Sequence, residues 1–318
     1  MDGAKVIVNP NSANGRTGRS WGLIEGEIGR RLGDFEAEFT GGPGEASGMA
    51  RRALKAGFGL VVAVGGDGTI GEVVNGFFED GRLVREDAQL GIISMGTGCD
   101  FVKTLGIPRT VPEAAAVLAE GGVVRCDAGV IQCAGADGAP VRRYFINIAD
   151  FGIGGEIVER VNRTTKVMRG FLSFLLGILR VSFTYRNKPV EIWIDGERVG
   201  ERTVKNVVVA NGQYFGGGMR MAREARPDDG LFEVIILGDM GFVESARMIR
   251  RMYSGAVTGL NKVERFRCRR VEARSEFRVT IDADGEQVGT LPATFELIPS
   301  CIQVKAPEQP PAAPDSKG

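Results

Sequence analysis

The strongest structural signal in the chain is the run Leu60-Val61-Val62-Ala63-Val64-Gly65-Gly66-Asp67-Gly68-Thr69. An apolar, β-branched run that ends at a pair of glycines predicts a buried parallel strand and a tight loop. Apolar residues then recur at helical spacing from Ile70 to Phe77, which predicts a helix. Backbone N–H groups at such a helix start, with no Cβ atoms in the way, form a site for anionic oxygens. A simple chain reversal is the alternative, and a phosphate site would require a cation or a hydroxyl to face Asp67.

The composition excludes several classes of protein. The chain has 318 residues, enough for one large or two modest domains, and its 40 basic and 40 acidic residues cancel. Without a net field, nucleic acid is not an expected partner. Five scattered cysteines without a C-x-x-C pair predict free thiols in a reducing compartment. No apolar signal region follows Met1, so we expect a cytoplasmic protein.

The absence of histidine restricts the chemistry that the chain can perform. Histidine triads, histidine metal sites and imidazole bases are excluded. A general base must be a carboxylate or, less often, a lysine or a cysteine thiolate. A bound metal would have oxygen ligands, which favours magnesium or calcium over zinc.

Strands and helices alternate in the first part of the chain, which predicts a parallel sheet with helices on both faces. In such sheets ligands bind at the carboxyl ends of the strands. Asn9, Thr40 and the loops that begin at Gly65 and Gly96 all lie at those ends. A second candidate phosphate cradle is the polar loop from Asn9, which includes Arg16 and Arg19. The expected strands are 5–8, 35–39, 60–64 and 89–93, and the expected helices include 21–32, 45–55, 101–105 and 112–120.

After residue 126 the pattern changes to short apolar runs, most of them bounded by Gly, Pro or Asp-Gly turns. This pattern is typical of an antiparallel sandwich. We therefore expect a Rossmann-like α/β domain over 1–127, a β-sandwich domain with inserted helices over 128–306, and a disordered tail over 307–318. The expected sandwich strands are 130–132, 144–149, 190–194, 207–210, 232–237, 277–281, 294–297 and 302–305.

Residues 170–179 form an uncharged helical interval with basic residues on both sides. A membrane span needs about 20 apolar residues, so this interval is too short. We interpret it as a buried core helix; the alternative is a helix that lines a lipid cleft or lies at a bilayer surface. A second basic cluster is either a solvated face or a membrane-adjacent surface. It comprises Arg247, Arg250, Arg251, Lys262, Arg265, Arg267, Arg269 and Arg270.

Several further motifs occur in a fixed order along the chain. They are Asn9-Pro10-Asn11-Ser12, Thr40, Gly65-Gly66-Asp67-Gly68-Thr69, Gly96-Thr97-Gly98-x-Asp100-Phe101, Asn147-Ile148-Ala149-x-x-Gly152, Pro227-Asp228-Asp229-Gly230-Leu231-Phe232 and Asp284-Gly285-Glu286. The Gly-Gly-Asp-Gly-Thr loop alone resembles that of NAD kinases, and phosphofructokinases carry a close variant. The full set, up to Pro307, resembles the diacylglycerol kinase catalytic-domain family of bacterial lipid kinases, which is related to sphingosine and ceramide kinases.

The resemblance implies that ATP and Mg²⁺ are the cofactors and that the active site lies in a cleft between the two domains. The Asp229 carboxylate and the backbone carbonyls of Arg226 and Leu231 would bind magnesium. The residues expected to hold ATP are Asn9, Pro10, Asn11, Ser12, Thr40, Gly65, Gly66, Asp67, Gly68, Thr69, Glu72, Gly96 and Thr97.

By the same resemblance, Glu286 would be the general base that takes the proton from the lipid hydroxyl, with Asp284 beside it and Asp67 also catalytic. Independently of the resemblance, phosphoryl transfer needs a base aligned on the acceptor hydroxyl. Because the chain has no histidine, a carboxylate is the expected base. Asp284-Gly285 is also a standard hairpin turn, and such a turn can still carry the base. The run Asp228-Asp229-Gly230 is either a turn or a pair of acids suited to a hard cation.

Three positions depart from the pattern of most relatives. Asparagine is usual where this chain has Gly71 and Cys99, so polar contacts around the nucleotide or the acceptor are expected to be weaker. Many relatives have an acid where Gly154 stands, although others have glycine-rich versions of this segment.

We expect a magnesium-dependent lipid kinase that transfers the ATP γ-phosphoryl group to diacylglycerol or a related lipid such as phosphatidylglycerol. It would be cytoplasmic and would dock transiently on the inner membrane face; a homodimer is compatible with this expectation. One alternative is a soluble small-molecule kinase of the NAD kinase type. The Asn9-Pro10 start, the Pro227-Asp228-Asp229-Gly230 turn and the expected 170–179 helix argue against it. Another is a binding protein that has lost catalysis, against which the retention of Asp67, Asp229 and Glu286 speaks.

Overall fold

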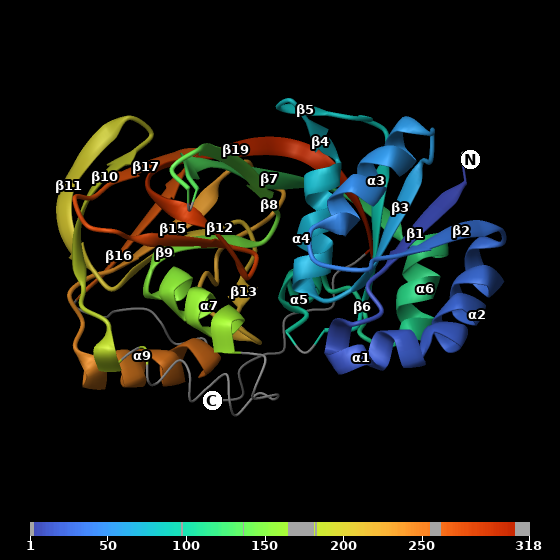
Figure 1. Ribbon diagram of the computed structural model, residues 1–318, viewed down its shortest axis with the longest axis horizontal. Helices are drawn as coiled ribbons and strands as arrows, with labels where there is room; N and C mark the ends of the chain where they lie inside the picture. Colours follow the sequence, from blue (N-terminus) through green and yellow to red (C-terminus); the bar gives the residue numbers. More distant parts are fainter. Residues whose placement is uncertain are drawn as a thin grey trace. The chain divides into compact units, whose positions relative to one another are not determined.

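The computed structural model describes residues 3–96, 98–135, 137–164, 181, 183–254 and 262–308. Contacts divide the chain into two compact units. Unit 1 comprises Met1–Cys126 and Ser300–Gly318, and unit 2 comprises Asp127–Pro299. Figure 1 allows the chain to be followed through each unit by its colour.

Unit 1 is built on a parallel sheet with the strand order β2-β1-β3-β6-β19. Apolar runs flanked by loops form its strands, as expected for strands buried on both faces. The strands are β1 (Ala4–Val8), β2 (Phe35–Phe39), β3 (Leu60–Gly65), β6 (Gln89–Ser94) and the end of β19 (Glu286–Ala306), and a separate hairpin joins β4 (Phe78–Glu79) to β5 (Arg82–Leu83).

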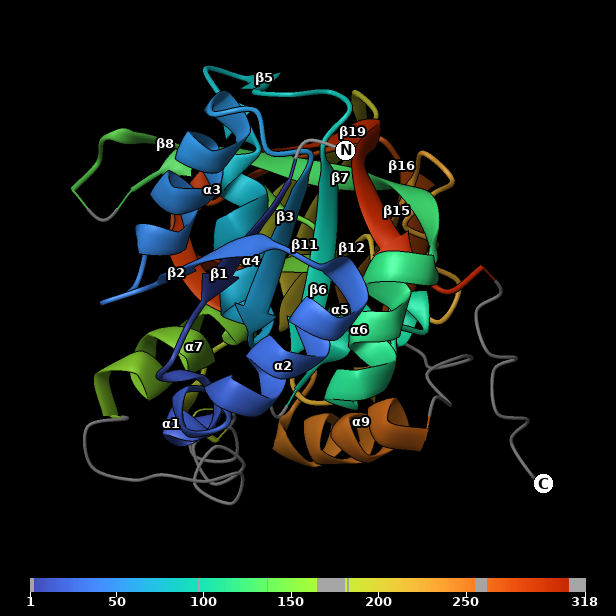
Figure 2. The same ribbon diagram turned by 90° about the vertical axis from the view of Figure 1, so that its right-hand side faces the viewer.

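Helices cover both faces of this sheet, as Figure 2 shows. Helices α2 and α6 pack against each other on one face, and α3 and α4 pack against each other on the opposite face. Side chains from alternate positions of β1 and β3, such as Val6 and Val62, form a core with Ile24, Ile28 and Leu118 of the first helix pair. The helices are α1 (Ser12–Arg19), α2 (Trp21–Leu32), α3 (Glu45–Lys55), α4 (Asp67–Gly76), α5 (Asp100–Leu105) and α6 (Val111–Glu120).

Unit 2 is a sandwich of antiparallel strands. One layer has the order β16-β15-β12-β9-β18, and the other contains β7, β8, β10, β11 and β17. Strand β19 belongs to both layers, because Glu286–Thr290 pairs with β18 and Ala293–Glu296 pairs with β17. The strands are β7 (Gly122–Ala134), β8 (Pro140–Phe145), β9 (Ile148–Gly152), β10 (Lys188–Ile194), β11 (Glu197–Val204), β12 (Asn206–Ala210), β15 (Phe232–Leu237), β16 (Val263–Cys268), β17 (Arg270–Arg274) and β18 (Thr280–Ala283), with a small hairpin of β13 (Tyr214–Phe215) and β14 (Met219–Arg220).

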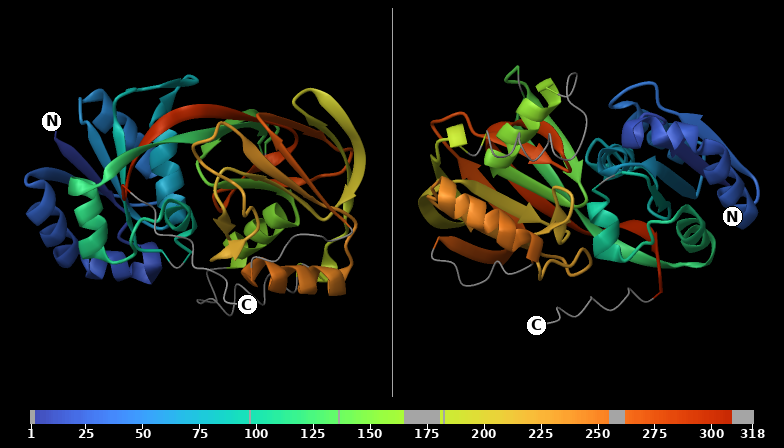
Figure 3. Two further views of the ribbon diagram at one scale, coloured as in Figure 1. Left: turned by 180° about the vertical axis from the view of Figure 1, so that it is seen from behind. Right: turned by 90° about the horizontal axis from the view of Figure 1, so that it is seen from below.

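The two faces of the layer that contains β9 and β12 have different coverings. One face contributes Phe151, Val207 and Val209 to the sandwich core. The opposite face carries α7 (Ile153–Thr164), which contacts β9 and β18, and α9 (Phe242–Ser254), whose Met248 joins a second apolar cluster with Val208. Figure 3 shows both helices on this outer face. Within the described residues no helix is long and apolar enough to cross a membrane.

The observed architecture confirms the fold class predicted from the sequence, an α/β sheet followed by an antiparallel sandwich. Several local expectations were wrong. The expected strand 144–149 is divided between the end of β8 and the start of β9, and the expected strand 277–281 begins only at Thr280. Residues Ser12–Arg19 form a helix interrupted by left-handed residues at 13–15, where a loop was expected. Residues 302–305, grouped with the sandwich strands by sequence, instead pair in parallel with β6 of unit 1. The expected helix at 170–179 lies outside the described residues.

Candidate active site

The loops that follow β1 and β3 are joined by side-chain and backbone hydrogen bonds. The Asn9 side-chain amide donates to Thr69 Oγ1 at 3.0 Å, and the Asn9 backbone N–H donates to the Val64 carbonyl at 2.9 Å. Asn11 and Ser12 donate to Asn9 in turn, through the backbone N–H and the hydroxyl. The structure therefore brings two of the predicted phosphate-binding motifs together at the carboxyl ends of adjacent strands.

Glycines allow these loops to approach each other closely. A Cβ at Gly65 would lie 2.4 Å from Thr69 Oγ1, and a Cβ at Gly96 would lie 2.9 Å from the Gly66 Cα. Both distances are too short for a Cβ atom, so both positions require glycine, and at Gly66 and Gly96 the loops after β3 and β6 approach each other through their backbones. Backbone N–H groups without covering side chains are what a phosphate site requires.

The Asp67 carboxylate connects the loop after β3 to the start of α5. It accepts a hydrogen bond from the Asp100 N–H at 2.8 Å, and the N–H groups of Cys99 and Phe101 contribute further. Burial is the main cause that raises the pKa of Asp67, and the neighbouring Asp100 carboxylate raises it further. The Asp100 carboxylate itself is paired with Lys103 at 2.9 Å. These N–H donors explain how a carboxylate can be accommodated in a loop whose backbone N–H groups favour anions.

Three other predicted nucleotide residues have different surroundings. Thr40 is buried after β2, and its N–H donates to the Val8 carbonyl at 2.9 Å. The Glu72 carboxylate is buried between α3 and α4, where it accepts the Ala46 N–H at 3.1 Å. Thr97 lies outside the described residues. The nucleotide-binding role of all three stays a prediction.

The two departures in unit 1 have local consequences. Cys99 adopts a left-handed conformation with φ of 51°, which asparagine adopts more easily than most residues. Its thiol donates to the Gly96 carbonyl, with Sγ and the oxygen 2.8 Å apart, so the sulfur still ties the loop together. Gly71 lies inside α4, where its carbonyl accepts a hydrogen bond from the side chain of Asn75.

In unit 2, Asp284 fixes the turn that carries the predicted base. Asp284 and Gly285 both have positive φ and join β18 to β19 as a hairpin turn. The Asp284 carboxylate accepts three backbone N–H groups, from Ile146 at 2.9 Å, Asn147 at 3.1 Å and Ile148 at 3.0 Å. A carboxylate with three donors holds the turn against the segment that contains the predicted Asn147 motif.

Glu286 is the first residue of β19 and is about one-third exposed. Its carboxylate forms an ion pair with Arg143 of β8, a residue that sequence reasoning did not identify. The available signal was a pair of arginines, Arg142 and Arg143, in a short strand that is otherwise largely apolar.

The turn around Asp229 has the donor chemistry that magnesium requires, namely one carboxylate and nearby backbone carbonyls. Asp229 Oδ1 accepts the Leu231 N–H at 3.1 Å, and Oδ2 is paired with Arg267. The turn is anchored from β7, because the buried Asp127 carboxylate accepts the Gly230 N–H at 2.8 Å. Oxygen donors fit the ion, which would have to compete with Arg267 for the carboxylate. Within the described residues no cluster of three metal-ligating side chains is formed.

Two buried acids of unit 2 were not identified from the sequence. Asp150 of β9 and Asp282 of β18 are register partners. Burial raises the pKa of Asp150 to about 7, and burial followed by the charge of Asp150 raises the pKa of Asp282 well above its ordinary value. A Cβ at Gly154 would lie 2.1 Å from Asp150 Oδ1. The Asp150 carboxyl group therefore occupies the space that a side chain at position 154 would need. The signal for Asp150 was an acid in the middle of an apolar strand.

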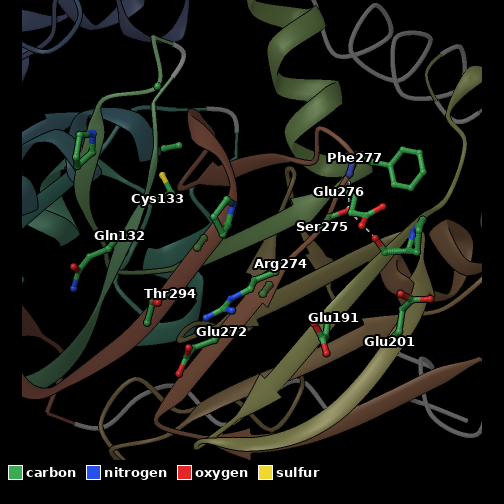
Figure 4. A pocket seen from close by; sticks show the side chains of 17 residues that line it. Gln132, Cys133, Glu191, Glu201, Glu272, Arg274, Ser275, Glu276, Phe277 and Thr294 are labelled. Carbon is green, nitrogen blue, oxygen red and sulfur yellow. Dashed lines mark hydrogen bonds between the residues drawn. The ribbon is translucent and has the colours of Figure 1, made fainter.

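Unit 2 also has an open pocket of about 860 Å³, which Figure 4 shows. Its lining includes Glu191, Glu201, Glu272 and Glu276. None of the predicted site residues lines it, and its carboxylates would repel an anionic phosphate.

Comparisons with known proteins identify relatives of both units. The diacylglycerol kinase catalytic domain matches residues 3–131, and the YegS C-terminal NAD kinase beta sandwich-like domain matches residues 147–306. The chain is 30% identical to a diacylglycerol kinase of Bacillus subtilis, over 97% of this chain and 98% of that protein. A crystal structure of a diacylglycerol kinase from Bacillus anthracis superimposes with a TM-score of 0.70 at 21% identity, covering 96% of this chain and 97% of the other. An NAD kinase from Archaeoglobus fulgidus in complex with ATP gives a TM-score of 0.50 at 17% identity, over 96% and 94% of the two chains.

Proposed function

The chain belongs to the diacylglycerol kinase family and is a lipid kinase, and on this premise we propose that it transfers the γ-phosphoryl group of ATP to a hydroxyl of diacylglycerol. The product would be phosphatidic acid. The observation that carries the proposal is the rigid Asp284-Gly285 turn, which presents a partly exposed carboxylate, Glu286, in a chain without histidine.

Unit 1 would bind the nucleotide through its loops after β1, β3 and β6. The glycine contacts at Gly65 and between Gly66 and Gly96 leave backbone N–H groups for the phosphate oxygens. Asp67 would act indirectly, because its carboxylate is already engaged by N–H groups at the start of α5. Its role would be to keep the two loops in one arrangement.

In the proposed mechanism, the Glu286 carboxylate takes the proton of the acceptor hydroxyl. The hydroxyl oxygen forms a bond to the γ-phosphorus while the bond from that phosphorus to the β–γ bridging oxygen breaks, and ADP leaves. Arg143 would orient Glu286 in the absence of the acceptor, and Asp284 would hold the turn. Proton transfer to a general base contributes typically about 10²–10⁴-fold to the rate.

Magnesium would be held by the Asp229 carboxylate together with the carbonyls of Arg226 and Leu231. The ion would supply positive charge that offsets the negative charge of phosphate oxygens. The residues of this chain would contribute the turn itself, which Asp127 anchors through the Gly230 N–H.

We further propose that unit 2 docks on the inner membrane face through an apolar patch, Phe183, Phe242 and Val243. Phe183 and Phe242 are 75% and 41% exposed and pack edge to face with centroids 5.6 Å apart. Val243 is 59% exposed, and Arg247, one turn further along α9, is exposed on the same side. Exposed aromatics beside a cation suit an anionic bilayer surface.

The kinase proposal is tested with ATP, Mg²⁺ and mixed micelles of diacylglycerol, by following phosphatidic acid formation. Glu286→Gln should lower kcat by about 10²–10⁴-fold. The matched control is Glu296→Gln, an exposed acid of the same strand, which should retain activity. If NAD or another soluble acceptor is phosphorylated while all lipid acceptors stay unlabelled, the lipid substrate is wrong.

The docking proposal is tested by sedimentation with vesicles of phosphatidylcholine, with or without phosphatidylglycerol. Replacing Phe183 and Phe242 together by serine should weaken binding by about tenfold or more, given the apolar area removed. Leu23→Ser, at an equally exposed apolar position of unit 1, is the control. Equal vesicle binding by the double variant and the control would overturn the proposed patch.

A further inference from the structure

Asp150 and Asp282 form a pair of buried carboxyl groups that the proposed mechanism does not use. They lie directly opposite each other on the antiparallel strands β9 and β18, and both are almost completely buried. Directly opposed residues on such strands have Cβ atoms about 4.5–5.5 Å apart, which brings their carboxyl groups within reach of each other.

Each carboxyl group has one buried oxygen without a hydrogen-bond partner, Oδ1 of Asp150 and Oδ1 of Asp282. The side chain of Asn206 and the N–H of Gly155, at the start of α7, offset part of the rise in the pKa of Asp150, and the N–H of Gly285 does the same for Asp282. Two acceptors cannot satisfy each other, but one proton held between them would satisfy both.

The described groups around the pair are anionic or neutral, apart from two lysines that lie over the ring of Tyr185. On the hairpin, Asp284 and Glu286 add like charge to Asp282. Burial and then the charges of Glu156, on α7, and Asp150 raise the pKa of Tyr185, whose buried hydroxyl has no hydrogen-bond partner. Lys188 and Lys205 lie over the ring of Tyr185, with Nζ 5.2 Å and 5.6 Å from its centroid. Among the described residues, neither Asp150 nor Asp282 forms an ion pair with a lysine or an arginine. A doubly ionised pair would therefore be strongly disfavoured.

The pair lies at the attachment of the catalytic turn. Strands β9 and β18 share three register pairs, and Asp150–Asp282 is the middle one. Beyond this ladder, the Asp284 carboxylate accepts the N–H groups of Ile146, Asn147 and Ile148, which lead into β9. Repulsion within the pair would act on the strand pairing that holds both Asp284 and Glu286.

We propose that Asp150 and Asp282 share one proton at neutral pH and act as positioning residues for the Asp284–Glu286 turn, so that loss of this proton at alkaline pH lowers kinase activity. The proposal rests on the proposed role of Glu286 as the general base. It predicts that an amide, which carries its own proton donor, can replace one of the two acids.

Asp282→Asn is the decisive variant. Its amide N–H₂ donates to the orphan oxygen of Asp150, and its carbonyl oxygen can still accept the Gly285 N–H. We expect kcat/KM of the wild type to fall at least about tenfold more than that of Asp282→Asn between about pH 7 and about pH 10. Asp282→Ala, which has no donor, should lose at least about tenfold at neutral pH. Asp150→Asn is the reciprocal variant, and the exposed Glu197→Gln controls for the loss of one charge.

Two readouts test the pair without using activity. The folded wild type should show the infrared carbonyl stretch of a protonated carboxylic acid at neutral pH, and Asp282→Asn should lack it. The folded pair retains a proton that the unfolded chain releases at lower pH, so wild-type stability should fall as pH rises, and Asp282→Asn should remove about one proton from this dependence.

The outcomes separate this proposal from the proposed function. Absence of the protonated band, or equal pH dependence of stability in wild type and Asp282→Asn, overturns the shared proton. A shared proton with parallel alkaline activity profiles in both proteins overturns its link to the turn. If instead Glu286→Gln retains full activity, the proposed base fails, while the infrared and stability measurements still decide the pair.

Discussion

The Asp67 carboxylate accepts the backbone N–H of Asp100 at 2.8 Å, which joins the glycine loop after β3 to the first turn of α5. Further N–H groups, from Cys99 and Phe101, face the same carboxylate. Because these donors belong to the loop after β6, the acid sets the distance between two loops that we propose hold phosphate. In the proposed site, the acid would hold the two loops together without approaching the phosphate itself.

Replacing Asp67 should therefore affect nucleotide binding and stability together. Asp67→Ala leaves buried N–H groups without an acceptor, which costs about 1–3 kcal/mol for each group left unsatisfied. We expect a lower free energy of unfolding and at least about a tenfold higher KM for ATP. Urea unfolding and initial rates measure both, with the exposed Asp34→Ala as control. An unchanged KM for ATP would contradict the assignment of the loop.

The glycine contact between the loops after β3 and β6 gives a steric prediction. Gly96→Ala would place a Cβ 2.9 Å from the Gly66 Cα, so the loops must move apart. Such overpacking costs typically about 1–3 kcal/mol, and we expect weaker ATP binding. Gly26→Ala, where nothing lies within 4 Å of the added Cβ in an exposed part of α2, should be neutral or stabilising. Calorimetric titration with ATP compares the two variants, and equal affinities would argue against a phosphate site here.

Asp284 offers a test of how much the catalytic turn depends on its three N–H contacts. Asp284→Ala should lower the free energy of unfolding by about 3 kcal/mol or more, because three N–H groups lose their acceptor. It should also lower kcat, since Glu286 follows two residues later. The matched control is Asp195→Ala, at another Asp-Gly turn with positive φ, whose carboxylate accepts the N–H groups of Arg269 and Arg270.

The two Asp-Gly turns separate stability from catalysis. Asp195→Ala should destabilise unit 2 and leave kcat unchanged under conditions where the protein is folded. If both variants lower kcat in proportion to their loss of stability, Asp284 has no specific role at the site.

The cysteines predict a simple pattern of chemical reactivity. Four of them, Cys99, Cys126, Cys133 and Cys268, are buried, and Cys301 is partly exposed. Burial raises the pKa of the Cys133 and Cys268 thiols, which lowers the thiolate fraction further. A thiol-specific chromogenic reagent should modify one cysteine rapidly in the folded protein and the others only on unfolding. Cys301→Ser should abolish the fast phase, and more than one fast thiol would contradict the described burial.

The sequence was informative wherever a few neighbouring residues decide the conformation. The run from Leu60 to Thr69 predicted a strand, a loop and a helix start, and all three are present. The turn at Asp284-Gly285 could also be predicted from the sequence, because a turn with positive φ at two successive positions favours aspartate and glycine. The expected helix over 45–55 was confirmed with the same bounds.

Long-range partners could not be predicted in this way. Nothing near Asp67 indicates that its carboxylate would receive the N–H of a residue 33 positions later. The expected strand at 302–305 was recognisable, but its parallel pairing with β6 depends on where the chain returns after the sandwich. The opposition of Asp150 and Asp282 follows from the register of β9 and β18, which is set by the packing of Phe151 and Ile281 into the core on the other face.

By itself, the sequence determined the elements, the glycine loop, the acidic turns and the restriction to carboxylate chemistry, since these depend on residue type and local spacing. Only the tertiary structure decided which acid faces which donor. The hydrogen bonds of Asp284 with residues 136–138 positions away, and the opposition of Asp150 and Asp282, are consequences of strand register. Register is fixed by burying whole faces of the sheet at once, a property that no short segment of sequence contains.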